Sequence, residues 1–316
     1  MAIPRVTVTN SQNPGQSSLI LGATGQVGRA LTHFLGPGTI SLSRAQADLS
    51  RPQSLREVLD QYRPAVIYNA AAYTQVDLAE REEEQAFLAN AESPAVLAEW
   101  AAQNQAILIH YSTDYVFSGE GIRPWTEQDP VSPQNAYGRT KLEGEHRIAR
   151  AGGRYLIFRT SWVYDATGKN FVTSMLKLGS ERELLKIVAD QTGAPTYAPH
   201  LAETTLRAVK NATEQKVFPS GIYHLCNSGE TTWFDFSQAI FSGARTRGLS
   251  LKVKNVLPIP SSEFPTPAKR PKNSRLDNHK AATLLKVVMP TWESGLNSCM
   301  DAMTQSERKD ILRENH

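Results

Sequence analysis

The chain has 316 residues, of which 40% are hydrophobic and 21% charged, with a formal net charge of +3. This size suits one large domain or two smaller ones with a sizeable core. The lysines and arginines are spread along the chain, which argues against a nucleic-acid partner.

Other features of the composition narrow the class of protein. No apolar run approaches the ~20 residues needed to span a bilayer, and the first ten residues lack the apolar core of a signal peptide. The two cysteines, Cys226 and Cys299, form no CxxC or Cys/His ligand pattern. We therefore expect reduced structural thiols, no metal site, no membrane partner and a cytoplasmic location.

The predicted elements alternate along the first half of the chain. Residues 1–16 are rich in Ser, Asn, Gln and Pro, and we interpret them as a flexible tail. Apolar runs then predict strands, and amphipathic stretches predict helices, one of them broken near Ser93-Pro94. The strands are 18–21, 39–43, 65–68, 106–111 and 154–159, and the helices are 26–35, 54–62, 79–104 and 136–150. This order predicts an α/β fold with a Rossmann-type doubly wound parallel sheet.

Turn residues multiply after about residue 165, which indicates a second, smaller α/β lobe. Tyr223–Cys226 is apolar and predicts a strand that returns to the main sheet. We therefore predict a dinucleotide-binding domain at 17–165, with 197–228 also in it. Residues 166–196 and 229–316 would form the substrate-binding lobe.

A glycine loop joins the first predicted strand to the first helix. Its glycines are Gly22, Gly25 and Gly28, with Gln26 and Val27 between the last two. Without Cβ atoms, the backbone N–H groups at the helix start can approach a dinucleotide pyrophosphate, and the third glycine lets the helix pack closely on the strand. A plain strand–turn–helix glycine cluster has the same spacing, but the position in the first βα turn favours binding.

The end of the second strand indicates which nicotinamide cofactor is bound. An acidic residue there would favour the ribose of NADH, whereas this strand ends at Ser43-Arg44. Arg44 can pair with a 2′-phosphate and Ser43 can donate to it, so we predict NADPH, with NADH possible. Asp48 follows, and it either caps the next helix or approaches the adenine. Arg44 as a merely solvated residue is the alternative.

The third strand ends with the small residues of Asn69-Ala-Ala-Ala72-Tyr73. Ligands of open α/β sheets bind at the carboxyl ends of the strands, where small side chains leave room for a flat ring. Ordinary tight packing accounts for these alanines equally well.

A proton-transfer group is indicated by Tyr137 and Lys141, four residues apart on a predicted helix. A free tyrosine has a pKa near 10, and a nearby ammonium would lower it. Thr113, at the end of the preceding strand, could donate a hydrogen bond to a ketone oxygen that gains negative charge. Tyr-x-x-x-Lys alone is weak, but together with Thr113 and the glycine loop it predicts a ketone reductase.

These residues resemble the extended short-chain dehydrogenase/reductase family, and in particular its reductases of 4-keto nucleotide sugars. The segments that carry the likeness occur in order, and the last three are the most specific: 22–28, 69–72, 110–117, 137–145, 158–164, 190–196 and 266–277. The resemblance implies NADPH-dependent reduction of the C4 ketone of dTDP-4-dehydro-β-L-rhamnose to dTDP-β-L-rhamnose, the last step of dTDP-L-rhamnose biosynthesis.

The resemblance also implies roles for individual residues. Tyr137 would be the proton donor, Lys141 would tune it and hold the ribose, and Thr113 with Asp114 would bind the keto sugar. Trp162 would line the sugar site and Arg270 would meet the diphosphate, although a core tryptophan and a surface arginine are the plain alternatives. The cofactor would contact Gly25, Gln26, Val27, Asp48, Leu49, Ala71, Ala72 and Tyr73. Some members are dimers, so a homodimer is possible.

Other functions stay open at this point. A nucleotide-sugar dehydratase shares most of this scaffold and carries a Thr-Asp-Glu pattern, in which both carboxyls help to eliminate water. Here Tyr115 follows Thr113-Asp114, so one of the two carboxyls is missing. An epimerase would use the same Tyr137 and Lys141 but return the hydride. The chain also resembles the NADP-binding beta subunit of methionine adenosyltransferase, a regulatory rather than a catalytic protein.

Overall fold

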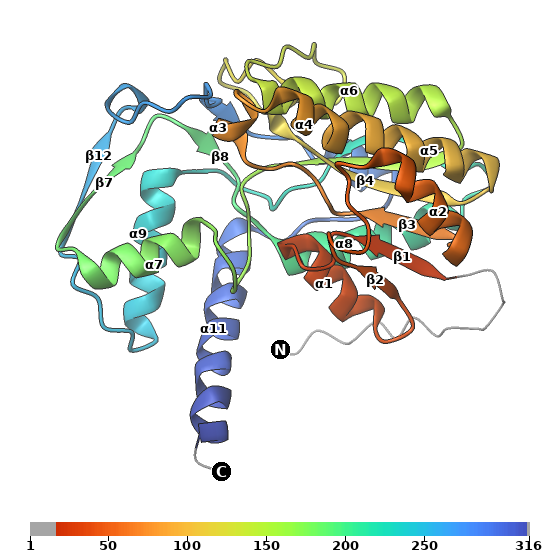
Figure 1. The fold of residues 1–316 in the computed structure, drawn as a ribbon. Helices are drawn as coiled ribbons and strands as arrows, with labels where there is room; N and C mark the ends of the chain where they lie inside the picture. Colours follow the sequence, from red (N-terminus) through yellow and green to blue (C-terminus); the bar gives the residue numbers. More distant parts are fainter. Residues whose placement is uncertain (1–16, 315–316) are drawn as a thin grey trace.

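The computed structural model describes residues 17–314, so the predicted tail at 1–16 lies outside the described residues. Its centre is a six-stranded sheet in the order β10-β5-β4-β3-β1-β2, and every pairing in it is parallel (Figure 1). The strands are β1 (Ser18–Leu21), β2 (Ile40–Leu42), β3 (Val66–Asn69), β4 (Ile107–Thr113), β5 (Arg154–Thr160) and β10 (Gly221–His224). The strand predicted at 223–226 therefore does join the main sheet, two residues earlier.

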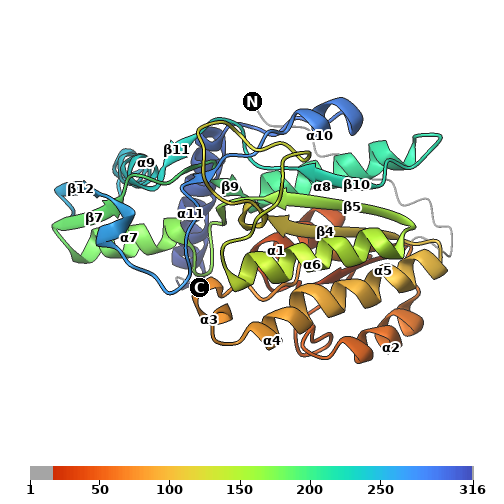
Figure 2. The ribbon, with the colours of Figure 1, turned by 90° about the horizontal axis from the view of Figure 1, so that it is seen from above.

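Helices cover both faces of this sheet because both faces are apolar (Figure 2). Along β1, Ile20 packs into one hydrophobic cluster, while Leu19 and Leu21 pack into another on the opposite face. The first cluster includes residues of α1 (Gln26–Leu35), α8 (Ala198–Thr213) and α10 (His279–Leu284). The second includes residues of α2 (Pro52–Tyr62), α5 (Ser93–Gln103) and α6 (Ala136–Ala151). The predicted doubly wound fold is confirmed.

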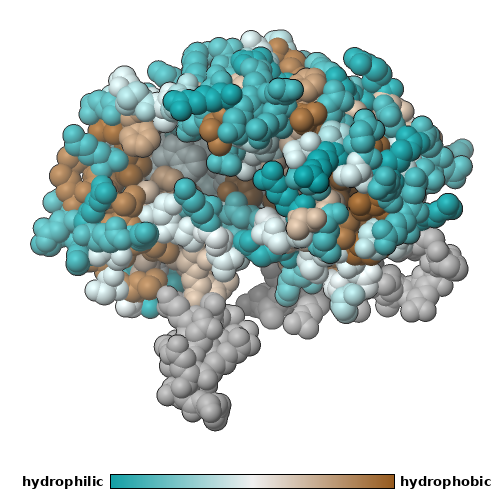
Figure 3. Space-filling model, viewed as in Figure 1, coloured by the Kyte–Doolittle hydropathy of each residue, from teal (hydrophilic) through white to brown (hydrophobic). Residues whose placement is uncertain are grey.

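A smaller lobe has its own core, formed by aromatic and aliphatic residues such as Tyr164, Phe236 and Phe241. It contains long helices that the sequence analysis did not predict, because many turn residues lie between them. Apolar side chains also gather on its outer surface, over the β7–β12 region (Figure 3). Its elements are β6 (Val163–Tyr164), α7 (Phe171–Glu181), β7 (Leu184–Val188), β8 (Thr192–Gly193), β9 (Thr196–Tyr197), β11 (Thr231–Thr232), α9 (Trp233–Thr246), β12 (Asn255–Ile259), a 3₁₀ turn (Ser261–Glu263), β13 (Asn273–Ser274) and α11 (Trp292–Glu314).

The helix predicted at 79–104 differs from the prediction in where it is interrupted. It consists of α3 (Val76–Ala79), α4 (Glu83–Phe87), a π-helical turn (Leu88–Glu92) and α5, and the chain stays helical through Ser93-Pro94. Pro94 has no N–H for the carbonyl of Asn90, four residues earlier, so the helix widens before it instead of breaking. That carbonyl lies against Gly144 of α6, where a Cβ atom would be 2.1 Å from it.

Side chains of α1 join the sheet domain to the first segment of the smaller lobe. Arg29 forms an ion pair with Asp165 at 3.0 Å and also donates to the carbonyl oxygen of Thr24 at 2.6 Å. Gln26 donates to the carbonyl oxygen of Val163 at 3.4 Å. The glycine loop and the entry to the smaller lobe are thus held against each other. Among the described residues, no helix is long and apolar enough to cross a membrane.

The contact between Gly144 and Asn90 gives a stability prediction. We expect Gly144→Ala to lower the free energy of unfolding by about 1–3 kcal/mol because the new methyl group meets backbone. The control is Gly243→Ala in α9, where the nearest atom would be 3.6 Å away. There the higher helix propensity of alanine should stabilise the protein by up to about 1 kcal/mol. Urea unfolding of both variants measures whether the free energy of unfolding changes with opposite sign in the two. Equal changes in both would contradict the packing argument.

Candidate active site

The glycine loop needs its glycines because three backbone segments meet there. Gly22 has a φ of +77°, and a Cβ on it would lie 2.8 Å from the Cα of Ala71 in the loop after β3. A Cβ on Gly28 would lie 2.0 Å from the carbonyl oxygen of Gly22. Gly25 is the N-cap of α1, and no side chain caps this helix. Its first N–H groups therefore remain available for a phosphate.

A cleft of about 650 Å³ runs along the carboxyl ends of the parallel strands. All but three of the residues predicted to form the site line it: Gly22, Gly25, Gln26, Val27, Arg44, Asp48, Leu49, Ala71, Ala72, Tyr73, Thr113, Asp114, Tyr137, Lys141 and Trp162. The cleft also includes Asn69 and Trp233, which the sequence analysis did not assign. The free helix N-terminus, the glycine cradle and this open cleft fit a dinucleotide.

Three predicted residues lie outside the lining of the cleft. Gly28 packs beneath Gly22 and acts through that contact. Ser43 is turned toward Gln46, whose Oε1 accepts from its hydroxyl at 2.9 Å and from its N–H at 3.0 Å. Arg270 donates to Asp77 at 2.6 Å and to the hydroxyl of Tyr115, a cleft residue, at 3.3 Å. The structure thus places Arg270 next to the cleft, held by a carboxylate.

Arg44 lies at the end of the cleft where β2 terminates. Its side chain is 79% exposed and lies 3.5 Å from Asp48, a pair that water weakens. Burial of Asp48 opposes ionisation, but hydrogen bonds from Ser50 and the charges of Arg44 and Arg51 hold its pKa below the usual value. The Arg44 guanidinium is therefore free to turn toward a phosphate.

The loop after β3 is held by Asn90 of the π-helical turn. The Asn90 side chain accepts from the N–H of Tyr73 at 2.9 Å, and its amide donates to the carbonyl oxygen of Tyr73 at 3.1 Å. It also donates to the hydroxyl of Thr140 in α6 at 3.2 Å. One buried amide therefore fixes the loop of Ala71, Ala72 and Tyr73 against the helix that carries Tyr137. π-Helical turns often occur at functional sites, but the sequence shows only Pro94 as a signal of this one.

Tyr137 and Thr113 lie next to each other in the cleft. Burial raises the pKa of Tyr137, while a hydrogen bond with Thr113 opposes this and the charges of Asp114 and Tyr115 add to it. Lys141 was expected to lower this pKa, but desolvation outweighs any such effect here. The phenol is therefore protonated at neutral pH and available as a donor. The Tyr115 ring contacts Tyr137 edge-on, at 5.5 Å between centroids.

Asp114 is a buried carboxyl beside Thr113. Burial raises its pKa to about 6, against hydrogen bonds from Ser274 and Thr113. The Thr113 hydroxyl donates to Oδ1 at 3.2 Å, while Oδ2 is buried without a partner. A buried oxygen without a partner can accept from a ligand hydroxyl. Asp114 begins a 3₁₀ turn (Asp114–Val116) that leads the chain away from β4.

Two tryptophans from distant segments stack in the wall of the cleft. The rings of Trp162 and Trp233 lie 3.6 Å apart with 12° between their planes. Trp162 has a φ of +50°, which is rare for a residue with a bulky side chain. Its ring also presses on Gly193, where a Cβ would lie 2.8 Å from Cε2. The indole N–H of Trp233 donates to Gln191 at 3.2 Å. The 190–196 segment therefore builds this aromatic wall.

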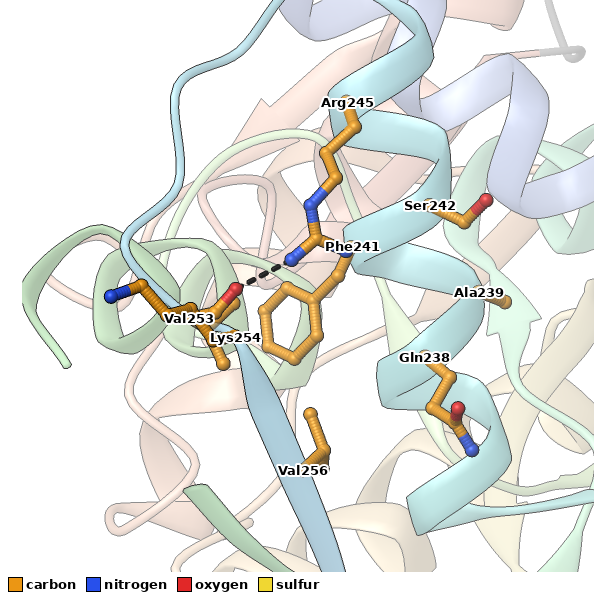
Figure 4. Close-up of a pocket in the computed structure, with 8 residues that line it drawn as sticks. All are labelled: Gln238, Ala239, Phe241, Ser242, Arg245, Val253, Lys254 and Val256. Atoms are coloured by element: carbon orange, nitrogen blue, oxygen red, sulfur yellow. Dashed lines mark hydrogen bonds between the residues drawn. The ribbon is translucent and has the colours of Figure 1, made fainter. Parts of the chain in front are cut away.

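A second hollow of about 430 Å³ lies between α9 and β12 (Figure 4). It is lined by residues such as Phe241, Val253 and Arg245, whose guanidinium donates to the carbonyl oxygen of Val253 at 2.6 Å. Lys254 at its edge is paired with Glu183 at 2.9 Å. Its charged groups are thus already bonded within the protein, and neither Tyr137 of α6 nor Thr113 at the end of β4 lines it.

Comparison with known proteins identifies what this chain resembles. Residues 17–305 match the family described as RmlD substrate binding domain. A dTDP-4-dehydrorhamnose reductase of Burkholderia thailandensis is 42% identical over 91% of this chain and 99% of that protein. A solved structure of such a reductase from Clostridium acetobutylicum is 35% identical, with a TM-score of 0.84 over 92% of this chain and all of that one. Another, from Bacillus anthracis in complex with NADP, is 35% identical, with a TM-score of 0.83 over 91% and 99% of the two chains.

The contact of Trp162 with Gly193 gives a prediction that needs no ligand. Gly193→Ala should push Trp162 off Trp233, remove most of the near-ultraviolet circular dichroism of the stacked indoles, and destabilise the fold by about 1–3 kcal/mol. Gly243→Ala, whose Cβ meets only ordinary contacts, should leave the spectrum unchanged. An unaltered spectrum in Gly193→Ala would show that the stack does not depend on this glycine.

Proposed function

Because the chain belongs to the family of the RmlD substrate binding domain, we propose that it catalyses the reaction for which its curated relatives are named. It reduces the C4 ketone of dTDP-4-dehydro-β-L-rhamnose to dTDP-β-L-rhamnose with NADPH, the last step of dTDP-L-rhamnose biosynthesis. The observation that carries this conclusion is one cleft that holds Tyr137, Thr113 and Lys141 together with the glycine loop. The names of these relatives support a reductase over the alternative of an NADP-binding regulatory subunit.

The cofactor would be held at the strand ends by the residues already described. The N–H groups of Gln26 and Val27 would meet its pyrophosphate, and Arg44 would meet the 2′-phosphate. Ala71, Ala72 and Tyr73 leave room along the middle of the cleft. When bound, the nicotinamide supplies a hydride to the ketone carbon.

The protein residues then act on the ketone oxygen. Thr113 lies beside Tyr137, so its hydroxyl can donate to the oxygen as negative charge develops. The Tyr137 phenol is protonated at neutral pH because burial raises its pKa, and its proton passes to the oxygen to form the hydroxyl group. The ammonium of Lys141, one helical turn away, favours the phenolate that remains.

The sugar and the diphosphate would lie on the other side of the cleft. Asp114, with Oδ2 free to accept, is placed to bind a sugar hydroxyl. The Trp162–Trp233 stack offers an apolar wall. Arg270 would exchange its bond with Asp77 for the diphosphate, since a guanidinium binds phosphate oxygens in pairs. We propose a matching division of roles between the domains predicted from the sequence: the dinucleotide binds to the sheet domain, and the sugar lies against the smaller lobe.

A further proposal concerns the location of the enzyme in the cell. Cys226 and Cys299 are buried and unpaired, which suits a reducing compartment, so we propose a cytoplasmic location. The homodimer stays a prediction.

The direct experiment supplies the 4-keto sugar with NADPH, follows loss of the reduced cofactor, and identifies the product. One equivalent of NADPH should disappear for each dTDP-rhamnose formed. An epimerase would return the hydride, so product without net NADPH loss would contradict the reductase.

Replacing Tyr137 with Phe tests the proton donor. Loss of the phenol should lower kcat by about 10²–10⁴-fold, the usual contribution of general acid catalysis. NADPH affinity, measured by fluorescence titration, should change little because the ring remains in place. Wild-type turnover in this variant would remove Tyr137 from the chemistry.

Replacing Arg44 with Ala tests the cofactor choice. The Kd for NADPH should rise by about 10-fold or more, since a charge-assisted hydrogen bond contributes roughly 1.5–3 kcal/mol. The Kd for NADH, which lacks the 2′-phosphate, should hardly move. Equal losses for both cofactors would contradict the pairing of Arg44 with phosphate.

A further inference from the structure

A chain of three buried polar side chains connects β3 and β4 to α6, the helix that carries Tyr137. Asn69 in β3 and His110 in β4 are directly paired in the sheet register, and Lys141 reaches them from α6. Lys141 Nζ lies 3.0 Å from His110 Nε2, and His110 Nδ1 lies 3.0 Å from Asn69 Nδ2. Each of the three side chains is at most 1% exposed. The ammonium also donates to the carbonyl oxygen of Tyr111 at 2.6 Å.

The protons on this chain can be arranged in two ways. Burial and the charge of Lys141 hold the pKa of His110 well below 6.5, so its ring is neutral and has one N–H. An ammonium can only donate, so a charged Lys141 requires His110 Nε2 to accept and the ring proton to lie on Nδ1. Asn69 must then turn its oxygen toward that N–H.

The second arrangement has a neutral Lys141. When the amide nitrogen of Asn69 donates to Nδ1, the ring proton lies on Nε2 and points at Nζ, which must accept it as a free amine. In this orientation the amide oxygen of Asn69 is buried without a partner. The amide orientation, the tautomer of His110 and the charge of Lys141 therefore change together.

The charges around Lys141 do not by themselves keep it protonated. Desolvation lowers its pKa to about 7, and only Glu145 on the same helix opposes this. Glu145 is in turn neutralised by a buried ion pair with Arg159 of β5, at 2.6 Å. Several carboxylates of the elements packed against α6 are bonded to other groups: Asp77 with Arg270, Glu80 with the N–H of Ala136, Glu83 with Arg139, Glu92 with Arg147, and Asp114 with Thr113. Glu84 of α4 and Glu99 of α5 are exposed to water.

We propose that His110 and Asn69 are positioning residues that hold the proton of Lys141. His110 accepts the hydrogen bond of the ammonium at Nε2, and Asn69 selects the tautomer that allows it. The kinetic part of this proposal rests on the proposed reductase function, because it takes the charged Lys141 as the form that supports proton transfer from Tyr137. The positions of the protons on Lys141 and His110 are a property of the free protein and do not depend on that function.

The first experiment measures the tautomer of His110 in the free protein. ¹⁵N-histidine labelling and long-range ¹H–¹⁵N spectra distinguish Nδ1–H from Nε2–H, and loss of a signal in His110→Gln assigns it among the seven histidines. We expect Nδ1–H below the pKa of Lys141, near 7, and Nε2–H above it. A neutral ring that carries its proton on Nε2 throughout the range from pH 5.5 to 9, or a ring that becomes charged in this range, would overturn the proposal.

The second experiment follows kcat against pH in variants. Removing the acceptor with His110→Phe disfavours the ammonium, so its pKa should fall and the alkaline loss of activity should begin about one pH unit lower. His110→Gln keeps an acceptor near Nε2 and should restore most of the profile. Asn69→Asp accepts from Nδ1–H at all times, so the alkaline limb should move to higher pH.

The controls separate this role from a purely structural one. NADPH affinity and circular dichroism are measured for each variant, and if His110→Phe does not fold, Asn69→Asp and the tautomer spectra decide the matter. Each of three outcomes would overturn the proposal. The alkaline limb of the pH profile could stay unmoved in folded His110→Phe, or His110→Gln could be as impaired as His110→Phe. The third outcome is an alkaline limb that moves to lower pH in Asn69→Asp. If the wild type does not reduce the 4-keto sugar, the proposed function fails, while the tautomer spectra still test the proton placement.

Discussion

The site depends on how closely the backbone segments approach at the carboxyl ends of the parallel strands. Gly22 and Gly28 leave no room for a Cβ between β1, α1 and the loop after β3. Because these segments touch, the free N–H groups of α1 open into the same cleft as Tyr137 and Thr113. The buried amide of Asn90 completes the arrangement by fixing Tyr73 to α6. The proposed dinucleotide site and the proposed proton donor therefore lie in the same cleft.

Burial has opposite effects on the ionisable groups of this cleft. It raises the pKa of Tyr137 and of Asp114, and it lowers the pKa of Lys141. Burial alone therefore favours a neutral phenol at Tyr137 and a neutral amine at Lys141. Hydrogen bonds oppose this effect of burial. The bond with Thr113 lowers the pKa of Tyr137, and in our proposal His110 and Asn69 favour the charged form of Lys141. This second group lies between α6 and the strands β3 and β4 and, in our proposal, does not contact the keto sugar.

Much of this could be predicted from the sequence, because the main signals are local. The glycine spacing and the four-residue separation of Tyr137 and Lys141 follow from the geometry of one turn or one helix. The alternation of strands and helices likewise predicted the parallel sheet. The rest depends on register and tertiary contact. Nothing local places His110 opposite Asn69, brings Trp233 onto Trp162, or pairs Arg270 with Asp77.

The two sides of the cleft are fastened by bonds of different kinds. On the side of the glycine loop, Gln26 and Arg29 hold the smaller lobe through partly buried bonds to Val163 and Asp165. On the other side, the basic segment around Arg270 combines partly buried bonds, such as that from Asn135 to the carbonyl oxygen of Lys269, with exposed ion pairs, such as that of Lys269 with Glu120. Salt and competing anions weaken exposed pairs far more than buried ones. An elongated polyanionic ligand can therefore displace the exposed ion pairs of this segment as it enters, while the partly buried bonds on both sides hold the cleft together.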